Sequence, residues 1–594
     1  MTVRTRTHEI VIVGAGPVGM TLLLGLRAAG IDAVAVDRGD GPTHYPKARI
    51  VSARSMELLR RLGVAEEVLK RSLAGDWTER VVVARTLAGR ELLRVESPSG
   101  PGGGRTASPE RRVLCTQDRV ERILAARIAA VAPDSVRWRC EAVGVTQGPE
   151  LASVTLRQRA GGGGDGDGGS GGGDSGAGRG GTDDSEPFTL AARYVVLADG
   201  CRGLGAGSAV PGAGSRRKMM PQVSFLIDAD LRPVVADRPA LISYLVGGRH
   251  PAQLLCVDGD REWIVATVPV GAATARDYPP ERVAQVLSAV LGLPVDHDVI
   301  ATAKAREIRL WDIGIRIADT FVAGRIIRAG DAAHELSPTG GMGMNLGLAD
   351  VDALAWRLSA ILRGWGAHRL ILDYEAERRP IALRTSLWTR ECFNTVALLS
   401  HAAAHGDDAA DLEQAARGLA VYLDHPGLDV GPLLPPQEEP PGVLVDDGRP
   451  GSRAPHVRLA DGTSTIELYG GDPVLLIGAD DAEDSTEDSA GDSADDSADG
   501  GTGTAELAAA AAARIGAPLR IARLPAEALA RHGVGGRGAV LVRPDGYVVW
   551  RTESTATWAR PGERSCERSA GHGEFEDALR RLAGTGGGRA EQGV

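Results

Sequence analysis

Three glycines near the N-terminus have the spacing of a phosphate-binding turn. Gly14, Gly16 and Gly19 follow an apolar, β-branched run and precede a stretch of helix-forming residues. In such a turn the first glycine permits the bend, the second lets the backbone approach a pyrophosphate, and the third lets the helix pack on the strand. Asp37 ends the next apolar run, where a carboxylate can accept hydrogen bonds from ribose hydroxyls. The pattern predicts a dinucleotide site, but by itself it does not separate NAD from FAD.

Two more turns that carry a glycine and an aspartate follow apolar runs later in the chain. Residues 194–200 read YVVLADG, and residues 325–331 read RIIRAGD. A glycine-rich stretch, residues 340–347, then leads into a helical pattern, with Pro338 fixing the chain just before it. The start of that helix, at Met344–Asn345, is a second place where free backbone N–H groups can face a ligand.

A parallel sheet is needed to position these turns. Residues 10–13 and 33–36 are apolar runs suited to strands buried on both faces, and residues 20–29 between them predict a helix. Residues 221–308 instead alternate between apolar and polar positions, which predicts antiparallel strands. Helix is expected again from Arg369 to about Leu423. The sequence therefore predicts an α/β protein with a second, antiparallel sheet.

The glycine motif, the Asp199 turn and the segment GDAAH…PTGGMGMN, in this order, resemble those of the FAD-dependent aromatic hydroxylases, or group A flavoprotein monooxygenases. The resemblance covers about residues 9–380. Within the family, the chain is most similar to bacterial aromatic polyketide hydroxylases and phenol hydroxylases. The implied fold is a Rossmann-like FAD-binding domain of the para-hydroxybenzoate hydroxylase type, with an interleaved antiparallel substrate sheet and a C-terminal thioredoxin-like domain.

The resemblance also implies domain limits. The expected parts are 1–215 with 305–380 for FAD, 216–304 for substrate, 381–432 as a helical segment, and 442–594 as the thioredoxin-like domain. A proline-rich break, LLPPQEEPP, marks the last boundary. A hairpin is expected to turn at residues 544–546 in this domain. No CxxC pair occurs there, so a structural or assembly role is expected instead of disulfide chemistry.

The family motifs assign residues to the cofactor. Asp331 is expected to bind the ribityl chain, and the backbone near Asn345 to meet the isoalloxazine, where a helix N-terminus stabilises negative charge on reduced flavin. Lys47 stands where the family usually has Arg, and Gln117 matches a flavin-contacting glutamine. The full expected set is Gly14, Gly16, Pro17, Gly19, Asp37, Arg38, Lys47, Gln117, Asp199, Gly330, Asp331, Pro338, Gly341, Gly343, Met344 and Asn345.

Several residues depart from the family pattern or carry two interpretations. Asp37 replaces the commoner Glu, and Cys201–Arg202 replaces the usual Arg–Ser pair after Asp199. That motif is thought to serve both FAD and a transient nicotinamide cofactor, so NADPH and NADH both stay open. Arg54 is a weaker phosphate candidate, and its alternative is a solvated residue in the first turn of a helix.

No metal site is expected. His401 and His405 are four residues apart, but no Glu follows His401 as in HExxH, so both are interpreted as surface or packing residues. His334, which directly follows the GD turn, is interpreted as a structural histidine near the flavin loop. The six cysteines form no CxxC pair, which is typical of a reducing compartment.

Charge and glycine are unevenly distributed over the 594 residues. The formal net charge is −11, but residues 161–185 and 480–499 are Gly- and Asp-rich inserts that together account for the acidity and leave the remainder slightly positive. We expect disordered loops at 161–185 and 479–503, because such compositions bury little apolar surface. Nucleic acid and membrane partners are not expected, and neither is a signal segment. A cytoplasmic monomer or homodimer is predicted.

The activity implied by the resemblance is hydroxylation. NADPH or NADH would reduce FAD, O2 would add at the flavin C4a, and the hydroperoxide would transfer one oxygen atom to an aromatic polyketide. No catalytic side chain is assigned, because the cofactor carries the chemistry. Aromatic residues make up only 4%, so a pocket lined by aliphatic residues is expected, with Tyr244, Trp263 and Trp311 as possible core residues. Baeyer–Villiger-type insertion beside a ketone and a non-catalytic FAD-binding assembly protein remain alternatives.

Overall fold

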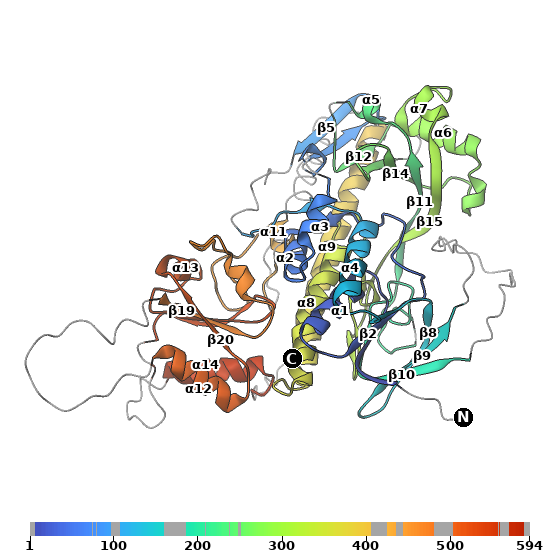
Figure 1. Cartoon of the computed structure of the whole chain (residues 1–594). Coiled ribbons are helices and arrows are strands. Elements are labelled where there is room, and N and C mark those ends of the chain that lie inside the picture. The colour runs from blue at the N-terminus through green and yellow to red at the C-terminus, as the bar shows by residue number, and fades with distance from the viewer. Residues whose placement is uncertain are drawn as a thin grey trace, which may run out of the picture.

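Three larger sheets, a two-stranded sheet and a pair of long helices organise the described part of the chain (Figure 1). The computed structural model describes residues 6–73, 75–78, 80–96, 107–159, 186–207, 209–236, 238–247, 251–405, 425–429, 431–434, 443–479, 503–555, 558 and 570–586. The glycine-rich insert 161–185 and nearly all of the acidic insert 479–503 lie outside these residues, as does the segment 406–424 for which helix was predicted.

The first sheet contains the predicted strand–helix–strand unit. β1 pairs in parallel with β2 and β10, and β10 pairs in parallel with β17. The strand order is β16-β17-β10-β1-β2-β7, and the β8–β9 hairpin joins through β10. The bounds are β1 (Arg6–Val13), α1 (Pro17–Ala28), β2 (Ala33–Val36), β7 (Val136–Arg137), β8 (Cys140–Gln147), β9 (Ala152–Gln158), β10 (Phe188–Leu197), β16 (Val322–Ala323) and β17 (Ile326–Arg328).

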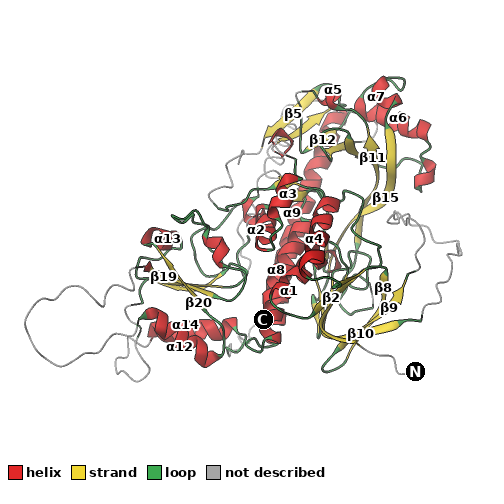
Figure 2. Cartoon of the chain, viewed as in Figure 1, coloured by secondary structure: helices red, strands yellow, loops and turns green. Residues whose placement is uncertain are grey.

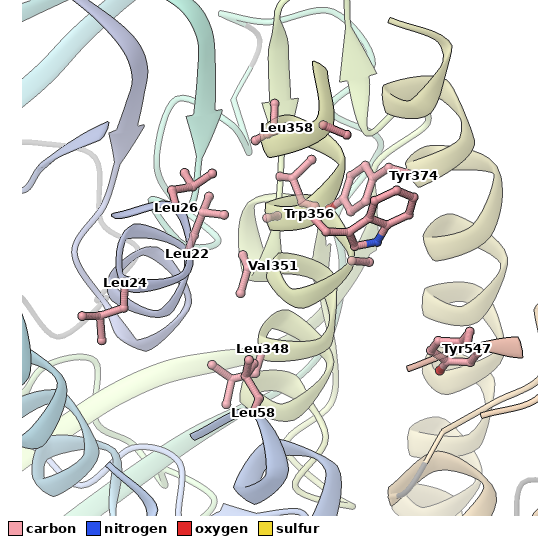
Figure 3. Close-up of a cluster of buried hydrophobic side chains, with 14 of the residues drawn as sticks. Leu22, Leu24, Leu26, Leu58, Leu348, Val351, Trp356, Leu358, Tyr374 and Tyr547 are labelled. Carbon is pink, nitrogen blue, oxygen red and sulfur yellow. The ribbon is translucent and has the colours of Figure 1, made fainter. Parts of the chain in front are cut away.

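Helices cover this sheet and build the largest core cluster. Leu22 and Leu26 of α1 pack with Val351 and Leu358 of α8, and Tyr374 of α9 belongs to the same cluster (Figure 3). The long helix α9 continues through Pro380, so the expected boundary at residue 380 falls inside one helix. The bounds are α2 (Ala53–Arg61), α3 (Ala65–Lys70), α4 (Gln117–Val131), α8 (Gly343–Leu362), α9 (Arg369–His405) and α11 (Pro426–Asp429).

The second sheet has the order β18-β15-β11-β14-β13-β12-β4-β5. Its pairs are antiparallel except β12 with β4. The bounds are β4 (Arg80–Ala84), β5 (Glu91–Glu96), β11 (Arg217–Asp228), α5 (Arg232–Val235), β12 (Ile242–Leu245), β13 (Ala252–Cys256), β14 (Glu262–Thr267), α6 (Pro280–Leu291), α7 (Asp298–Ala301), β15 (Lys304–Ile317) and β18 (His334–Glu335). The sheet thus contains more of the chain than the expected 216–304. β4 and β5 join it from a distant part of the sequence, and the alternation of apolar and polar residues does not reveal which strands pair.

The two faces of this sheet have different surroundings. Phe225 and Trp263 point to the side covered by α6 and are fully buried there. Tyr244 lies on the opposite side, in a cluster with Met342 of the glycine-rich stretch. Trp311 is half-buried and donates from its indole nitrogen to the Ser224 hydroxyl at 3.1 Å. Tyr244 and Trp263 are core residues, as one interpretation of the sequence proposed.

The C-terminal part forms a smaller sheet with the order β20-β19-β21-β22. Helices α12 and α14 lie on one side of it and α13 on the other (Figure 2). The predicted hairpin is present, since β21 and β22 pair antiparallel and Gly546 N donates to Arg543 O at 2.9 Å. The bounds are β19 (Val474–Gly478), α12 (Thr504–Ile515), β20 (Arg520–Leu524), α13 (Ala526–Arg531), β21 (Ala539–Val542), β22 (Val548–Thr552) and α14 (Ala570–Leu582), and a two-stranded sheet joins β3 (Ile50–Val51) to β6 (Val113–Leu114).

Among the described residues, no helix combines the length and apolar character required to cross a bilayer.

Phe225 is a buried side chain whose loss should weaken the second sheet. It is 0% exposed and meets the Tyr278 ring edge-on at a centroid distance of 5.1 Å. We expect Phe225→Ala to cost about 3–5 kcal/mol because it leaves a cavity in this core, and thermal unfolding followed by tryptophan fluorescence measures the effect. Leu387→Ala is the control, because Leu387 is 54% exposed on α9 and should change stability little. Equal midpoints for the two variants would contradict the prediction.

Candidate functional site

The three turns predicted to bind a dinucleotide meet at one edge of the first sheet. Parallel pairing places the ends of β1, β10 and β17 side by side, and each turn begins where its strand ends. Gly14 has φ +101°, and a Cβ there would lie 2.3 Å from the Ala198 carbonyl oxygen. A Cβ at Gly19 would lie 1.9 Å from the Gly14 carbonyl oxygen. Both glycines are therefore required by the packing of the protein itself.

Gly16 differs from its two neighbours in the motif. In the part of the chain that the structure describes, no atom beyond the adjoining residues lies within 4 Å of a Cβ built at this position. Gly16 is also the N-cap of α1, with Pro17 as the first helical residue and no side chain capping the helix. An uncapped helix N-terminus with open space in front of it suits the pyrophosphate of a dinucleotide.

The Asp37 carboxylate is fixed by the backbone around it. One oxygen accepts from Ala15 N and the other from Gly39 N, each at 2.7 Å. The side chain is only half-buried, and each oxygen keeps a lone pair for a further donor. This geometry fits a ribose hydroxyl. Arg38 beside it is exposed.

The GD turn and the glycine-rich stretch come together at the start of α8. Gly330 has φ +61°, and Asp331 O δ1 lies 3.8 Å from a Cβ built at Gly343. Asp331 is exposed, and its carboxylate accepts no hydrogen bond from any described residue. Gly341 N donates to Pro338 O at 3.1 Å, which closes the turn before the helix. The exposed carboxylate suits the hydroxyl groups of a ribityl chain.

The side chain of Asn345 holds the glycine-rich stretch in place. Its oxygen accepts from Ser52 N at 2.9 Å and from Ser55 Oγ at 2.8 Å. Its nitrogen donates to Ile50 O at 3.0 Å and Gly341 O at 2.9 Å. The amide is fully used inside the protein, so only the backbone of Asn345 is left to meet a cofactor. The two serines were not among the predicted site residues, although they flank a helix start in the sequence.

Gln117 also makes its hydrogen bonds within the protein. Its amide nitrogen donates to Glu121 Oε1 at 2.7 Å, and its backbone N–H donates to Ala48 O at 2.7 Å. Glu121 in turn accepts from Thr43 N at 2.7 Å, and burial raises the pKa of its carboxyl. Together these contacts fix residues 43–48, which carry the exposed Lys47.

His334 is a buried structural residue. Its Nε2 lies 2.6 Å from Asp350 Oδ2, and the same oxygen accepts from Gly330 N at 3.1 Å. Arg378 Nε donates to the other oxygen of Asp350 at 2.8 Å. Burial alone would raise the pKa of Asp350, but His334 and Arg378 outweigh it and hold that pKa below its usual value. Asp350 and Arg378 were not predicted from the sequence. The one signal for them is that each is a charged residue at a helical position where the surrounding pattern is apolar.

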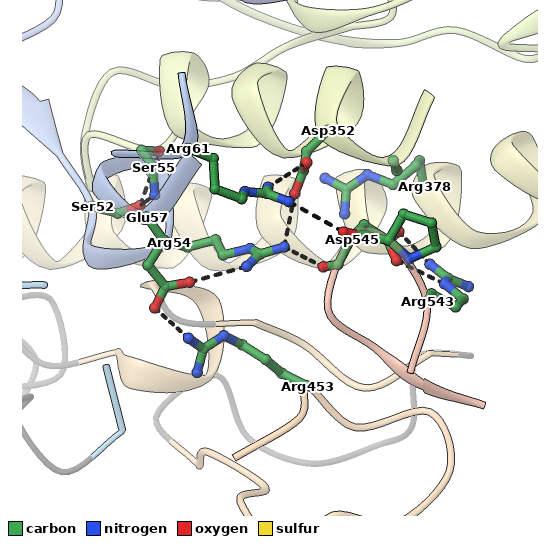
Figure 4. Close-up of polar contacts among 12 residues, drawn as sticks. Ser52, Arg54, Ser55, Glu57, Arg61, Asp352, Arg378, Arg453, Arg543 and Asp545 are labelled. Carbon is green, nitrogen blue, oxygen red and sulfur yellow. Dashed lines mark hydrogen bonds and ion pairs between the residues drawn. The ribbon is translucent and has the colours of Figure 1, made fainter. Parts of the chain in front are cut away.

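Arg54 is not exposed to solvent, and it does not lie among the candidate phosphate-binding groups. Its side chain is 11% exposed, and it donates to Glu57 at 3.0 Å and to Asp352 at 2.8 Å (Figure 4). Both interpretations drawn from the sequence are therefore corrected. The reason is the C-terminal part of the chain, which covers this turn of α2 and removes it from solvent.

The remaining polar candidates are spread more widely. Asp199 is half-buried behind the Gly14 turn and accepts from Gly205 N at 3.3 Å. Burial raises the pKa of Asp199 to about 6. Arg202 is exposed. His401 is exposed on α9, and the described residues contain no group of three or more side chains able to hold a metal ion.

The second sheet and α9 close over the glycine-rich stretch. Val81, Val83 and Tyr244 cluster there with Met342 and Trp388. A Cβ at Gly340 would lie 2.5 Å from the Trp388 ring, so only glycine allows this approach. The core cluster beside the stretch is thus mostly aliphatic, with Tyr244 and Trp388 as its aromatic members, and the expected aliphatic pocket stays a prediction.

Comparisons with known proteins agree with this architecture. A family model described as "FAD binding domain" matches residues 7–389, and one described as "Aromatic-ring hydroxylase, C-terminal" matches residues 447–585. A putative polyketide hydroxylase from Streptomyces halstedii is 30% identical, over 92% of this chain and 93% of its own. Aklavinone 12-hydroxylase RdmE from Streptomyces purpurascens is also 30% identical, over 92% of this chain and 96% of its own. The crystal structure of the flavin-dependent monooxygenase PieE with FAD and substrate superposes with TM-score 0.78 at 23% identity, covering 98% of this chain and 99% of that one.

The Gly16→Ala variant tests whether the space at Gly16 is needed by a ligand or by the packing of the protein. The new methyl group meets no protein atom, so we expect unchanged thermal stability without cofactor. FAD binding should weaken by about tenfold or more, because the methyl group occupies the space of the pyrophosphate. Titration of flavin fluorescence measures the affinity. Gly14→Ala is the contrast, since it should destabilise the protein even without FAD. Unchanged FAD affinity in Gly16→Ala would count against the site.

The raised pKa of Asp199 predicts how the stability of the folded protein depends on pH. Its pKa is raised in the folded protein, so the folded state binds the proton more tightly and loses stability as pH rises through about 6. Asp199→Asn removes this penalty. At pH 8 we expect the cofactor-free variant to be more stable than the natural protein by up to about 3 kcal/mol. The difference should shrink as pH falls towards 4, which thermal unfolding at several pH values tests. A difference that does not vary with pH would contradict the burial argument.

Proposed function

Since this chain belongs to the FAD-binding aromatic-ring hydroxylases and is a flavin-dependent monooxygenase, we propose that it uses NADPH or NADH and O2 to hydroxylate a polycyclic aromatic polyketide. The observation that carries the proposal is the meeting of the Gly14–Gly19, Asp199 and Gly330–Asp331 turns beside the glycine-rich start of α8. Three turns and one helix start therefore lie close together, and each can contact a different part of one dinucleotide.

The residues present fit FAD. Asp37 would accept from the adenosine ribose, the open turn at Gly16 would hold the pyrophosphate, and Asp331 would accept from the ribityl chain. Lys47 would add positive charge near the phosphates, without the bidentate fork of an arginine. When bound, FAD supplies the oxygen-transfer chemistry.

The chain's own contribution is positioning, charge and exclusion of water. The backbone from Gly341 to Asn345 would face the flavin ring, and the N-terminal end of α8 would stabilise negative charge there. The Asn345 side chain holds this backbone at Gly341 O, and Asp350 holds the neighbouring GD turn at Gly330 N. The second sheet covers the same region with apolar side chains, which keeps water away from the reacting atoms.

The substrate class is supported by two observations. The relatives named above include a putative polyketide hydroxylase and an aklavinone hydroxylase, and each aligns over more than nine-tenths of its length. The aliphatic face beside Tyr244 suits a flat, apolar ring system. Trp388 is buried in the same cluster.

We also propose that the C-terminal domain is thioredoxin-like. The parallel pairing of β19 with β20 and the antiparallel pairing of β19 with β21 and of β21 with β22 support this assignment. The sequence of this part has no CxxC pair, which supports a structural role over a redox one.

Purification and turnover test the function. We expect the protein to bind FAD, become yellow and oxidise NADPH or NADH faster when a suitable polycyclic phenol is present. The product should gain one oxygen atom by mass, and NMR should place it on an aromatic carbon. Oxygen inserted beside a ketone would instead establish the Baeyer–Villiger alternative. Failure to bind FAD after reconstitution would refute the proposal.

A further inference from the structure

The C-terminal domain contacts the FAD-binding domain through charged groups that are almost completely buried (Figure 4). The hairpin turn at residues 543–547 presents two carbonyl groups to α2. Arg54 donates to Asp545 O, and Arg61 donates to Pro544 O at 3.2 Å. Both arginines also bind Asp352 of α8, so one turn engages two helices at once.

Ion pairs also cross the same boundary. Arg453 of the C-terminal domain pairs with Glu57 of α2 and donates to Ala107 O at 2.7 Å. Glu57 is 1% exposed and Arg453 is 3% exposed. Arg543 donates to Glu377 of α9 at 2.7 Å, and Glu377 also accepts from Arg357 of α8 at 2.7 Å. The C-terminal domain is thereby fixed to α2, α8 and α9.

The helices held in this way carry the glycine-rich stretch. Ser52 caps the start of α2 and, with Ser55, holds the oxygen of Asn345, whose nitrogen binds Gly341 O. A cavity of about 30 Å³ is lined by Ser52 and Asn345 together with Asp545 and Tyr547 of the hairpin. Such a space holds little more than a water molecule, so a displacement of the turn would be transmitted to the stretch.

We propose that the C-terminal domain is a clamp that sets FAD affinity, with Arg453 and the turn 543–547 as positioning groups that act through α2 on Asn345 and Gly341. Buried ion pairs add little net stability compared with apolar packing, but they fix the relative orientation of the elements that they join. Here they join the domain to the helices that hold the flavin loop. This inference rests on the proposed function of the FAD site.

Arg453→Met tests the clamp, with Arg514→Met as the matched control. Arg514 lies in the same domain but pairs with Glu576 at the surface, away from α2 and α8. We expect Arg453→Met to weaken FAD binding by about tenfold, while Arg514→Met stays within about twofold of the natural protein. Flavin fluorescence titration gives the dissociation constant, and the visible flavin spectrum reports any change around the ring. Loss of stability without these changes would show a purely structural role and overturn the proposal.

A second variant covers the case in which Arg453→Met does not fold. Glu57→Gln combined with Arg453→Met removes both charges of this pair, and Arg54 keeps Asp352 as its partner, so no buried charge is left unpaired. The link from Arg453 to α2 is still lost. This double variant should fold and still bind FAD about tenfold more weakly. If either folded variant binds FAD like the natural protein, the inference fails and the proposed function stands. If the natural protein itself does not bind FAD, the proposed function fails.

Discussion

Parallel pairing of β1, β10 and β17 is the constraint on which the rest of the structure depends. It brings together three turns that are separated by well over a hundred residues in the chain and aligns them along one edge of the sheet. The glycines at that edge have different tasks. Gly14 and Gly19 allow the turn to pack on its own backbone, whereas Gly16 keeps space that no protein atom fills. One motif therefore contains both fold-forming and ligand-accommodating residues.

A set of buried polar groups holds this edge in shape. Asp350 joins the GD turn to α9, Asn345 joins the start of α8 to α2, and Glu121 joins α4 to the segment that carries Lys47. Each buried charge or amide is paired on several sides, as the cost of burying such groups requires. The exposed candidate groups, Asp331 and Lys47, are thus presented on a rigid frame, which suits a site that positions a cofactor carrying the chemistry.

The C-terminal domain extends that frame. Its sheet is joined to the FAD-binding domain by Arg453, Arg543 and the carbonyl groups of one hairpin turn. These contacts connect the domain to α2 and α9, the helices that also contact the start of α8 and the GD turn. The core residues of the two parts also merge, since Tyr547 packs in the same cluster as Leu348 and Tyr374.

The sequence alone determined the turns and the family. Glycine spacing, Asp37 and the GD turn are local features, because tight backbone bends accept few other residues, and they predicted the first sheet, α1 and the start of α8. Only the tertiary structure decided which polar side chains support the site. The sequence left Arg54 open as a phosphate contact or a solvated residue, but in the structure the C-terminal domain covers it. Likewise, β4 pairs with the second sheet although it comes from a distant segment. Such partners are non-local, so no spacing in the chain encodes them.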